Sequence, residues 1–300
     1  MRATIQLCTY NRADLLARVL DACFEQTVAA AEYEVVLVDD GSTDGRTGDV
    51  IARAQERAPC AFTVLRQQNS GLAAGRNNGI AHARGERIAF IDDDVLPLPD
   101  FVEEHLRSHA AHPLAIVRGA AINVESFDDL PPPVWTIRNY SGNFFWTTNV
   151  SVPLKTIRAA GGFNETFAEY GWEDIDVGLR LRFAGVKAVF NKHALVYHYK
   201  PRLRSSNVEK MLAQARAQAR TAVQLAQLHP HWRTYLATGD NAPSRLLHKW
   251  MRGIDMARHY RSALGDLSQD RPLNDSELRA AARLRTQTYF DELERARTRS

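Results

Sequence analysis

Three consecutive aspartates, Asp92, Asp93 and Asp94, directly follow a short apolar run at residues 88–91. The run is rich in β-forming residues and is bounded by charge at both ends, as is typical of a buried strand. Carboxylates packed at a strand end repel one another, and a divalent cation removes that repulsion. Mg²⁺ and Mn²⁺ bind few protein carboxylates and complete their shell with substrate phosphates. The triplet therefore predicts a metal–diphosphate site, with a solvated acidic turn as the alternative.

Polar residues also follow three further apolar runs, at 4–9, 34–38 and 62–65, which predict strands. The residues concerned are Thr9, Tyr10, Asn11 and Arg12, then Asp39, Asp40, Gly41 and Ser42, then Asn69, Gly71, Gly75, Arg76 and Asn77. Helical spacing predicts helices between these runs, the first at about 12–25 with Asn11 as its N-cap. Alternating strands and helices predict an α/β fold, with a mostly parallel sheet covered on both faces. Since ligands bind at the carboxyl ends of such strands, we expect one shared site.

The second half of the chain supplies further polar residues. Strands are predicted at 114–124, 144–152, 186–190 and 194–198, the second of them over the site. Gly119 inside the first of these strands indicates a bulge. A helix is expected to open around Glu173 and Asp174 and to end near residue 183, because its apolar residues share one stripe. His198 ends the last predicted strand.

From about residue 205 the chain is rich in Ala, Arg, Gln and Leu, which predicts an α-helical appendage. We therefore expect a catalytic domain at 1–204 and a helical region at 205–300. The segment 245–264 places Leu246 and Trp250 among basic residues. It is interpreted either as a basic amphipathic helix on a membrane surface or as a helix packed on its own domain or on a twin subunit.

The bulk composition narrows the class of protein. A net charge of +3 is too small to indicate nucleic-acid binding, and 45% hydrophobic with 24% charged residues is typical of soluble globular proteins. Three cysteines without metal-like spacing indicate a reducing compartment. Neither a basic-then-apolar leader nor an apolar run of about 20 residues is evident. We expect a cytoplasmic protein, with membrane association on the cytoplasmic side left open.

Taken together, these motifs resemble glycosyltransferase family 2, which has the GT-A fold. The resemblance covers about residues 3–200 and rests on the polar strand ends above, with the aspartate triplet in place of the family's Asp-x-Asp. Downstream, Gly161-Gly162-Phe163 and Trp172-Glu173-Asp174 resemble the galactosyltransferase-type C-terminal segment of this fold. The resemblance implies transfer of a sugar from a nucleotide-diphosphate sugar, with UDP-sugar as the expected donor, to an acceptor hydroxyl.

The resemblance also assigns roles on the donor side. It implies that Asp94 binds Mn²⁺ or Mg²⁺, that Asp92 contacts the ribose or an adjacent group, and that Asp93 is either a support or a ligand. His198 is expected to be a further metal ligand, with His193 as its competitor. The remaining donor-binding residues are Thr9, Tyr10 and Arg12 at the base, Asp40 at uracil with Asp39 in support, Asn69, and Arg76 at phosphate or an active-site acid. A plain β-turn at 39–42 and an exposed helix charge at Arg76 are the alternatives.

On the acceptor side, the resemblance implies that Asp174 is the general base and that Glu173 orients it. Ordinary acidic residues at a helix start are the alternative. Trp172 is expected to stack on a sugar, unless it is a core residue, and Asn149 is expected to contact donor sugar or acceptor. A single carboxylate base opposite the leaving group predicts inversion at the anomeric carbon.

Two other functions are weighed against this one. A sugar nucleotidyltransferase would share the α/β core and the metal acids, but the segment 9–12 lacks the glycine-rich triphosphate loop of such enzymes. A non-catalytic sugar- or membrane-binding scaffold on the same fold would not need both acidic sets. The sequence therefore favours a metal-dependent inverting glycosyltransferase.

Overall fold

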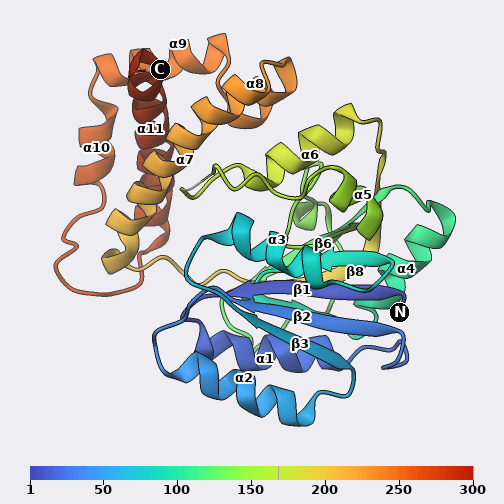
Figure 1. Ribbon diagram of the computed structural model, residues 1–300. Helices are drawn as coiled ribbons and strands as arrows, with labels where there is room; N and C mark the ends of the chain where they lie inside the picture. The colour runs from blue at the N-terminus through green and yellow to red at the C-terminus, as the bar shows by residue number, and fades with distance from the viewer. Residues whose placement is uncertain (168, 300) are drawn as a thin grey trace. The chain divides into compact units, whose positions relative to one another are not determined.

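A computed structural model describes residues 1–167 and 169–299 of the chain (Figure 1). The chain divides into two compact units. The first comprises Met1–Thr166 with Glu173–Lys200, and the second comprises Phe167–Trp172 with Pro201–Ser300. The assignment of a catalytic role to one part of the chain and an accessory role to the other stays a prediction.

A single mixed sheet forms the centre of the first unit, in the order β3-β2-β1-β4-β7-β6-β8-β5. Its strands are β1 (Ala3–Thr9), β2 (Tyr33–Asp39), β3 (Ala61–Arg66), β4 (Arg87–Phe90), β5 (Val95–Pro97), β6 (Ile116–Val124), β7 (Val150–Pro153) and β8 (Ala188–Tyr199). Strands β3, β2, β1 and β4 run parallel. Strand β7 is antiparallel to both β4 and β6, and β5 is antiparallel to β8.

Helices cover both faces of this sheet, which confirms the predicted α/β class. They are α1 (Ala13–Phe24), α2 (Arg46–Arg57), α3 (Leu72–His82), α4 (Phe101–Ala111), α5 (Leu154–Ala159) and α6 (Glu173–Phe183), with a 3-10 turn at Ile137–Asn139. One apolar cluster joins α1, α2 and α4 to the sheet, and a second joins α3, α5 and α6. Figure 1 shows α1 and α2 on the opposite side of β1–β3 from α3. Because both faces are covered, every residue of β1 and β2 is buried.

Three local predictions are corrected by the structure. Asn11 is not the N-cap of α1, which begins after Arg12; it adopts a φ of 53° and its Oδ1 accepts hydrogen bonds from the amides of Thr43 and Asp44. Of the strand predicted at 144–152, only the end is extended, as β7. The two strands predicted at 186–190 and 194–198 are one strand, β8. The bulge predicted at Gly119 is confirmed, because the β6–β8 register shifts there.

The second unit is helical, as its composition predicts. It contains a 3-10 turn at Ser205–Asn207 and the helices α7 (Val208–Leu228), α8 (Trp232–Thr238), α9 (Ala242–Gly253), α10 (Met256–Ser262) and α11 (Asp275–Arg299). Helix α7 packs along α11 through small and aliphatic side chains. The helix expected at 245–264 is two helices, because Asp255 adopts a φ of 50° and caps α10 by accepting a hydrogen bond from the Arg258 amide.

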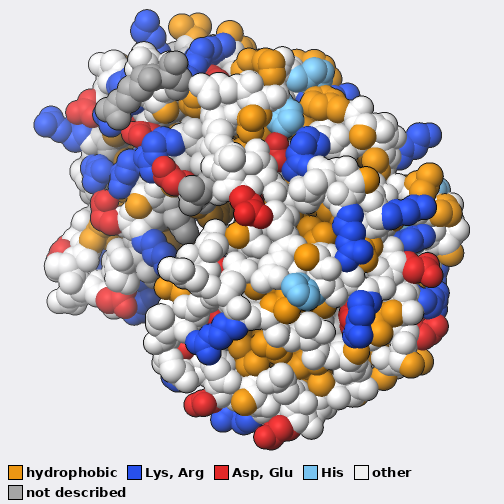
Figure 2. Space-filling model, viewed as in Figure 1, with side chains coloured by type: hydrophobic (Ala, Val, Ile, Leu, Met, Phe, Trp, Pro, Cys, Tyr) orange, Lys and Arg blue, Asp and Glu red, His pale blue; other side chains and the backbone are white. Residues whose placement is uncertain are grey.

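Helix α9 exposes large apolar side chains among basic ones. Leu246 is 72% exposed and Trp250 is 62% exposed, and both lie on one face of the helix. Figure 2 shows hydrophobic and basic side chains interspersed over α8 and α9. Among the described residues, the helices are all too short or too polar to span a bilayer.

Candidate functional site

A buried guanidinium connects the two acidic sets that the sequence singles out. Arg76 on α3 is only 4% exposed. Its Nη1 donates to Glu173 Oε1 at 2.9 Å, and its Nη2 donates to Asp92 Oδ1 at 3.2 Å and to Thr147 Oγ1 at 2.9 Å. The guanidinium also lies 5.2 Å from the ring centre of Phe163. Arginine suits this position because its planar fork donates in fixed directions and stays charged when buried.

The aspartate triplet lies in the turn between β4 and β5, and its carboxylates have different hydrogen-bond partners, although Arg12 lies within 4.0 Å of both Asp93 and Asp94. Asp92 Oδ2 accepts a hydrogen bond from Thr148 Oγ1 at 2.9 Å, and Asp93 Oδ2 accepts one from Thr9 Oγ1 at 2.8 Å. Arg12 lies 3.6 Å from Asp94 Oδ2. Burial, with the neighbouring aspartates, raises the pKa of Asp93 to about 7. The three side chains therefore do not form one interchangeable cluster.

Asp94 and His198 converge from different strands. The pairing of β5 with β8 sets Val95 opposite His198 and leaves His198 Nε2 3.5 Å from Asp94 Oδ1. Burial alone would raise the pKa of Asp94, but the hydrogen bond and charge of His198, together with the charge of Arg12, hold it below its usual value. The Nδ1 atom of His198 is buried and has no hydrogen-bond partner within the described ranges.

This pair of donors fits a divalent cation. A carboxylate kept ionised and an imidazole nitrogen offer the oxygen and nitrogen ligands that Mn²⁺ accepts. Over residues 1–167 and 169–299 there is no group of three or more His, Cys, Asp or Glu side chains arranged around one metal position. A cation held by Asp94 and His198 would thus keep most of its shell for phosphate oxygens and water.

The ends of β1, β2 and β3 lie side by side, as the sequence predicts for parallel strands. Thr9 is in register with Asp39, and Asp39 with Arg66. Asp39 Oδ1 accepts from the Ser42 amide at 2.9 Å, so it closes the turn after β2. Tyr10, beside Thr9, is 46% exposed at this edge.

Asp40 fastens the loop that leads into α3. Its carboxylate accepts hydrogen bonds from Gln67 Nε2 at 2.8 Å and from the amides of Ser70 and Gly71 at 2.9 Å each. Asn69 lies in the same loop and is exposed. Asp40 therefore fixes the conformation of the loop between β3 and α3.

The start of α6 brings the predicted base to the same set of contacts. Glu173 pairs with Arg76, and Asp174 Oδ1 accepts a hydrogen bond from the Ile175 amide at 2.7 Å. Burial and the adjacent charge of Glu173 raise the pKa of Asp174 to about 8, against the opposing effect of Arg76. A carboxylate with a raised pKa is a better proton acceptor near neutral pH.

Two predicted acceptor residues have other partners. Asn149 is fully buried: its Nδ2 donates to the carbonyls of Ala120 and Ala194, and its Oδ1 accepts from His105 Nε2. Through these contacts Asn149 links β6 to β8 inside the sheet. Trp172 belongs to the second unit, where its Nε1 donates to the Gln218 carbonyl at 2.8 Å.

Two threonines that the sequence reasoning did not single out contact the acids directly. Thr147 binds Arg76 and Thr148 binds Asp92, both through their hydroxyls. They lie in the segment before β7 that was expected to be a strand. The only sequence feature that could have indicated these contacts is the pair of adjacent hydroxyl side chains before a short β-rich run.

Comparisons with known proteins identify similar sequences and folds. The sequence profile described as "Glycosyl transferase family 2" matches residues 4–163. Validoxylamine A glucosyltransferase from Streptomyces hygroscopicus subsp. jinggangensis is 30% identical over 227 residues, covering 64% of this chain and 54% of that protein. This chain thus spans about half the length of that relative.

Solved structures share the fold. The mannosyltransferase PcManGT from Pyrobaculum calidifontis, in complex with GDP-Man and Mn²⁺, aligns with a TM-score of 0.64 at 18% identity, over 98% of this chain and 86% of that chain. S. aureus TarS 1–349 in complex with UDP-GlcNAc aligns with a TM-score of 0.59 at 16% identity, over 100% and 93%. These likenesses confirm the predicted GT-A fold.

Proposed function

Because this chain belongs to glycosyl transferase family 2, we propose that it transfers a sugar from a nucleotide-diphosphate sugar to an acceptor hydroxyl. The observation that carries the proposal is the buried Arg76, which binds Asp92 on the donor side and Glu173 on the base side. This arrangement differs from an ordinary surface salt bridge, because the arginine is almost inaccessible to solvent and has two acidic partners. The arrangement is what a reaction between two bound substrates needs, since it fixes both acidic sets relative to one another.

We propose UDP-sugar as the donor. PcManGT was solved with GDP-Man and TarS with UDP-GlcNAc, so the neighbours include both nucleotides. The choice rests on the resemblance of Asp40 to the acid that hydrogen-bonds uracil. Tyr10 is exposed at the strand edge next to Thr9 and is available to lie against the base of either nucleotide.

A divalent cation is part of the proposal. Asp94 and His198 would hold it, and when bound it supplies positive charge that stabilises the departing diphosphate. Arg12 lies beside Asp94 and adds a second positive charge on the same side. Asp93, bonded to Thr9, is proposed to support the turn.

Asp174 is proposed as the general base. The acceptor oxygen forms a bond to the anomeric carbon, the bond from that carbon to the diphosphate oxygen breaks, and the hydroxyl proton passes to the Asp174 carboxylate. Burial, with the charge of Glu173, raises the pKa of Asp174, and Glu173 is itself held by Arg76. Attack from the side opposite the leaving group gives inversion.

The test combines a donor screen with one isosteric variant. Wild-type protein with Mn²⁺ is incubated with UDP-glucose, UDP-galactose, UDP-N-acetylglucosamine and GDP-mannose, and released nucleotide is measured. We expect release from at least one UDP-sugar. Asp174→Asn should keep UDP binding and lose turnover, whereas Asp129→Asn, an exposed acid in a loop, should retain both.

Specific outcomes would overturn parts of the proposal. Stronger thermal stabilisation by CTP than by UDP with Mn²⁺ would favour a nucleotidyltransferase. A product with the donor's anomeric configuration would exclude inversion. Full activity of Asp174→Asn would remove the base assignment.

The second unit is proposed to make contact through α9, either with a membrane surface on the cytoplasmic side or with a second copy of the chain. The exposed Leu246 and Trp250 beside Arg245 and Lys249 support both. Co-sedimentation with anionic vesicles, abolished by Trp250→Ser, would identify the membrane contact. A dimer in solution that dissociates in the same variant would identify the second copy.

A further inference from the structure

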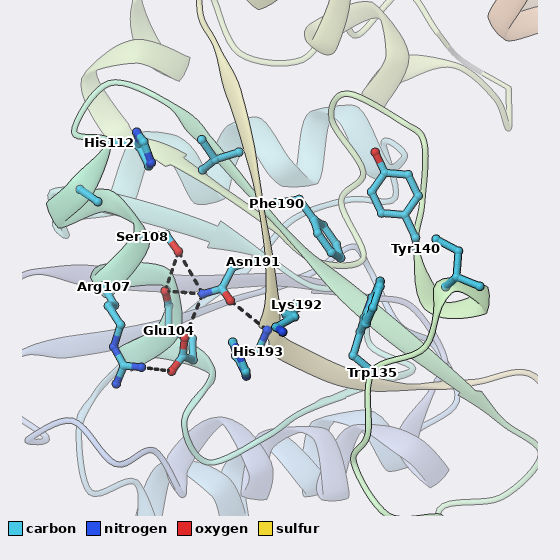
Figure 3. A pocket seen from close by; sticks show the side chains of 13 residues that line it. Glu104, Arg107, Ser108, His112, Trp135, Tyr140, Phe190, Asn191, Lys192 and His193 are labelled. Atoms are coloured by element: carbon cyan, nitrogen blue, oxygen red, sulfur yellow. Dashed lines mark hydrogen bonds and ion pairs between the residues drawn. The ribbon is translucent and has the colours of Figure 1, made fainter.

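A cavity of about 700 Å³ lies in the first unit between α4, the early part of β8 and the segment around residues 135–140 (Figure 3). Its volume is within the range of small-molecule pockets, about 300–1,000 Å³. His193, the competitor of His198 for the metal in the sequence analysis, lines it, whereas none of the residues proposed above for donor, metal or base does. Strand β8 contributes to both places: Phe190 and His193 line the cavity, while His198 at the far end of the strand pairs with Asp94.

A large bulge in β8 forms one edge of the cavity. Arg118 of β6 pairs with Phe190, and Ala120 pairs with Leu195, so five residue steps on β8 face two steps on β6. The residues between leave the ladder, and Asn191, Lys192 and His193 line the cavity. Bulges of this kind redirect side chains and are over-represented next to functional sites.

Buried groups hold the bulge in place. A Cβ on Gly119 would lie 2.2 Å from the Ala194 carbonyl oxygen and 2.4 Å from the Asn149 amide, so only glycine permits this approach. Asn149 donates to the carbonyls of Ala120 at 3.0 Å and Ala194 at 2.9 Å, and His105 fixes its amide. Its side chain thus satisfies carbonyls that the interrupted ladder leaves open, and the bulge is a defined feature of the fold.

The two sides of the cavity have different chemistry. Figure 3 shows the rings of Trp135, Tyr140 and Phe190 on one side and the polar side chains of Glu104 and Asn191 on the other. Ring centres are 4.9 Å apart for Tyr140 and Phe190 and 6.1 Å apart for Trp135 and Phe190. The indole Nε1 of Trp135 is buried without a hydrogen-bond partner in the described part of the chain.

On the polar side, Glu104 and Asn191 are bonded to one another and to their neighbours, and Asn191 Oδ1 accepts a hydrogen bond from the His193 amide at 2.8 Å. The side chains of Lys192 and His193 are exposed beside them and add a donor and an imidazole. Asn191 Nδ2 donates to Glu104 Oε2 at 2.9 Å and to Ser108 Oγ at 3.0 Å. The Glu104 carboxylate is 6% exposed and also pairs with Arg107 at 2.7 Å. Hydroxyl groups, which donate and accept at once, match such a mixed surface.

The charge of the lining argues against a phosphate ligand. Arg107 is already shared between Glu103 and Glu104, so its charge is compensated. Lys192 is the remaining fixed cation among the residues that line the cavity. Phosphate sites instead gather several arginine or backbone N–H donors.

From the aromatic side, the hydroxyl-matching side and the near-neutral lining, we propose that this cavity binds a neutral saccharide at a site separate from the donor site. The apolar C–H face of a sugar ring packs on the aromatic side chains, and its hydroxyls reach the exposed side chains of Lys192 and His193. The proposal concerns binding alone and does not require that the chain transfers sugars.

The test is binding of maltotetraose, cellotetraose and chitotetraose, measured by calorimetry and ligand-observed NMR without nucleotide or metal. We expect at least one to bind. Trp135→Ala and the exposed His193→Ala should each weaken that binding at least tenfold. The matched control Trp232→Ala removes a tryptophan that is 57% exposed in the second unit and should leave binding unchanged.

A further variant separates this site from the catalytic proposal. Asp94→Asn should bind the tetrasaccharide as wild type does, and UDP with Mn²⁺ should not displace it. The proposal is overturned if none of the three sugars binds at millimolar concentration. It is also overturned if Trp135→Ala and His193→Ala, folded by circular dichroism, bind as tightly as wild type, or if UDP competes.

Discussion

The first unit contains two sites, the acidic site around Arg76 and the cavity beside α4, that are held together by different interactions. The acidic site is a network in which the buried Arg76 balances Asp92 and Glu173, so each charge depends on another. The cavity beside α4 is shaped by a backbone bulge and lined by rings such as Phe190, and the charges of Glu104 and Arg107 in its lining are paired. Removing one member of a buried charge network leaves a partner uncompensated, whereas removing one aromatic side chain only reduces contact area. We therefore expect changes of the charged residues in the first site to affect stability and activity together. Changes of the aromatic side chains that line the cavity should affect mainly binding.

The largest expected effect comes from Arg76→Met. The substitution keeps the apolar length of the side chain but leaves Asp92 and Glu173 without their shared cation. Breaking a buried pair typically costs about 3–5 kcal/mol, so urea unfolding should show a loss of that order. Turnover should fall by at least about a hundredfold, because the base and the donor acids lose their common support.

The control for Arg76→Met is Arg53→Met, at an exposed position of α2. We expect it to change the free energy of unfolding by less than about 0.5 kcal/mol. If Arg76→Met proves equally mild, the acidic site is not a mutually dependent network and the contrast with the cavity disappears.

The pH dependence of turnover sharpens the role of Asp174. Burial and Glu173 raise its pKa, while Arg76 acts in the opposite direction, and Asp92 also raises it. Below that raised pKa the carboxyl is protonated and cannot accept a proton, so kcat/KM should increase with pH up to about 8. Glu173→Gln removes the like charge beside Asp174, so the rise of kcat/KM should occur at lower pH in this variant.

The assignment of Asp174 is contradicted if the rise of kcat/KM occurs at the same pH, or at a higher pH, in Glu173→Gln. Either result would mean that another group titrates, since loss of a neighbouring negative charge can only lower the pKa of a carboxyl. Unfolding midpoints measured across the same pH range exclude a change in stability as the cause.

The metal prediction is expected to have an intermediate effect. In wild type, UDP with Mn²⁺ should raise Tm more than UDP alone, and EDTA should remove the difference. Asp94→Asn should abolish the Mn²⁺-dependent part, and His198→Ala should reduce it, because these side chains supply the converging donors. Asp93→Asn should retain it, since Asp93 is bonded to Thr9. A full Mn²⁺ effect in Asp94→Asn would place the cation elsewhere.

Much of the acidic site could be predicted because its signals are local. A parallel sheet gathers its carboxyl strand ends at one edge, so Thr9, Asp39 and Asp92 were expected to be neighbours before any contact was known. Charged residues next to apolar runs are easily recognised. The sequence also predicted the helix start near Glu173, and it gave an active-site acid as one of two expected partners of Arg76. It did not identify Glu173 as that acid, since this bond joins residues 97 positions apart.

What could not be predicted depends on pairing between distant segments. Strand β5 is only three residues long and ends in Pro97, a composition typical of a turn; it is tolerated because β5 lies at the sheet edge. The contacts of Thr147 and Thr148 follow from the antiparallel entry of β7 between β4 and β6. The cavity beside α4 needs the approach of Gly119 to Ala194, and the sequence indicated only that Gly119 was a bulge.

The variant with the smallest expected effect tests whether the acidic site and the cavity beside α4 are independent. Gly119→Ala places a Cβ against the Ala194 carbonyl and the Asn149 amide, so the bulge must move. Overpacking of this kind costs about 1–3 kcal/mol, and we expect a moderate fall in Tm together with weaker tetrasaccharide binding. UDP and Mn²⁺ affinity should stay within about twofold of wild type, because the bulge lies several residues before His198 on β8.

Gly48→Ala is the matched control, since a Cβ there meets no atom within 4 Å. If Gly119→Ala weakens nucleotide binding as much as saccharide binding, the bulge transmits strain along β8 to His198. The acidic site and the cavity beside α4 are then coupled.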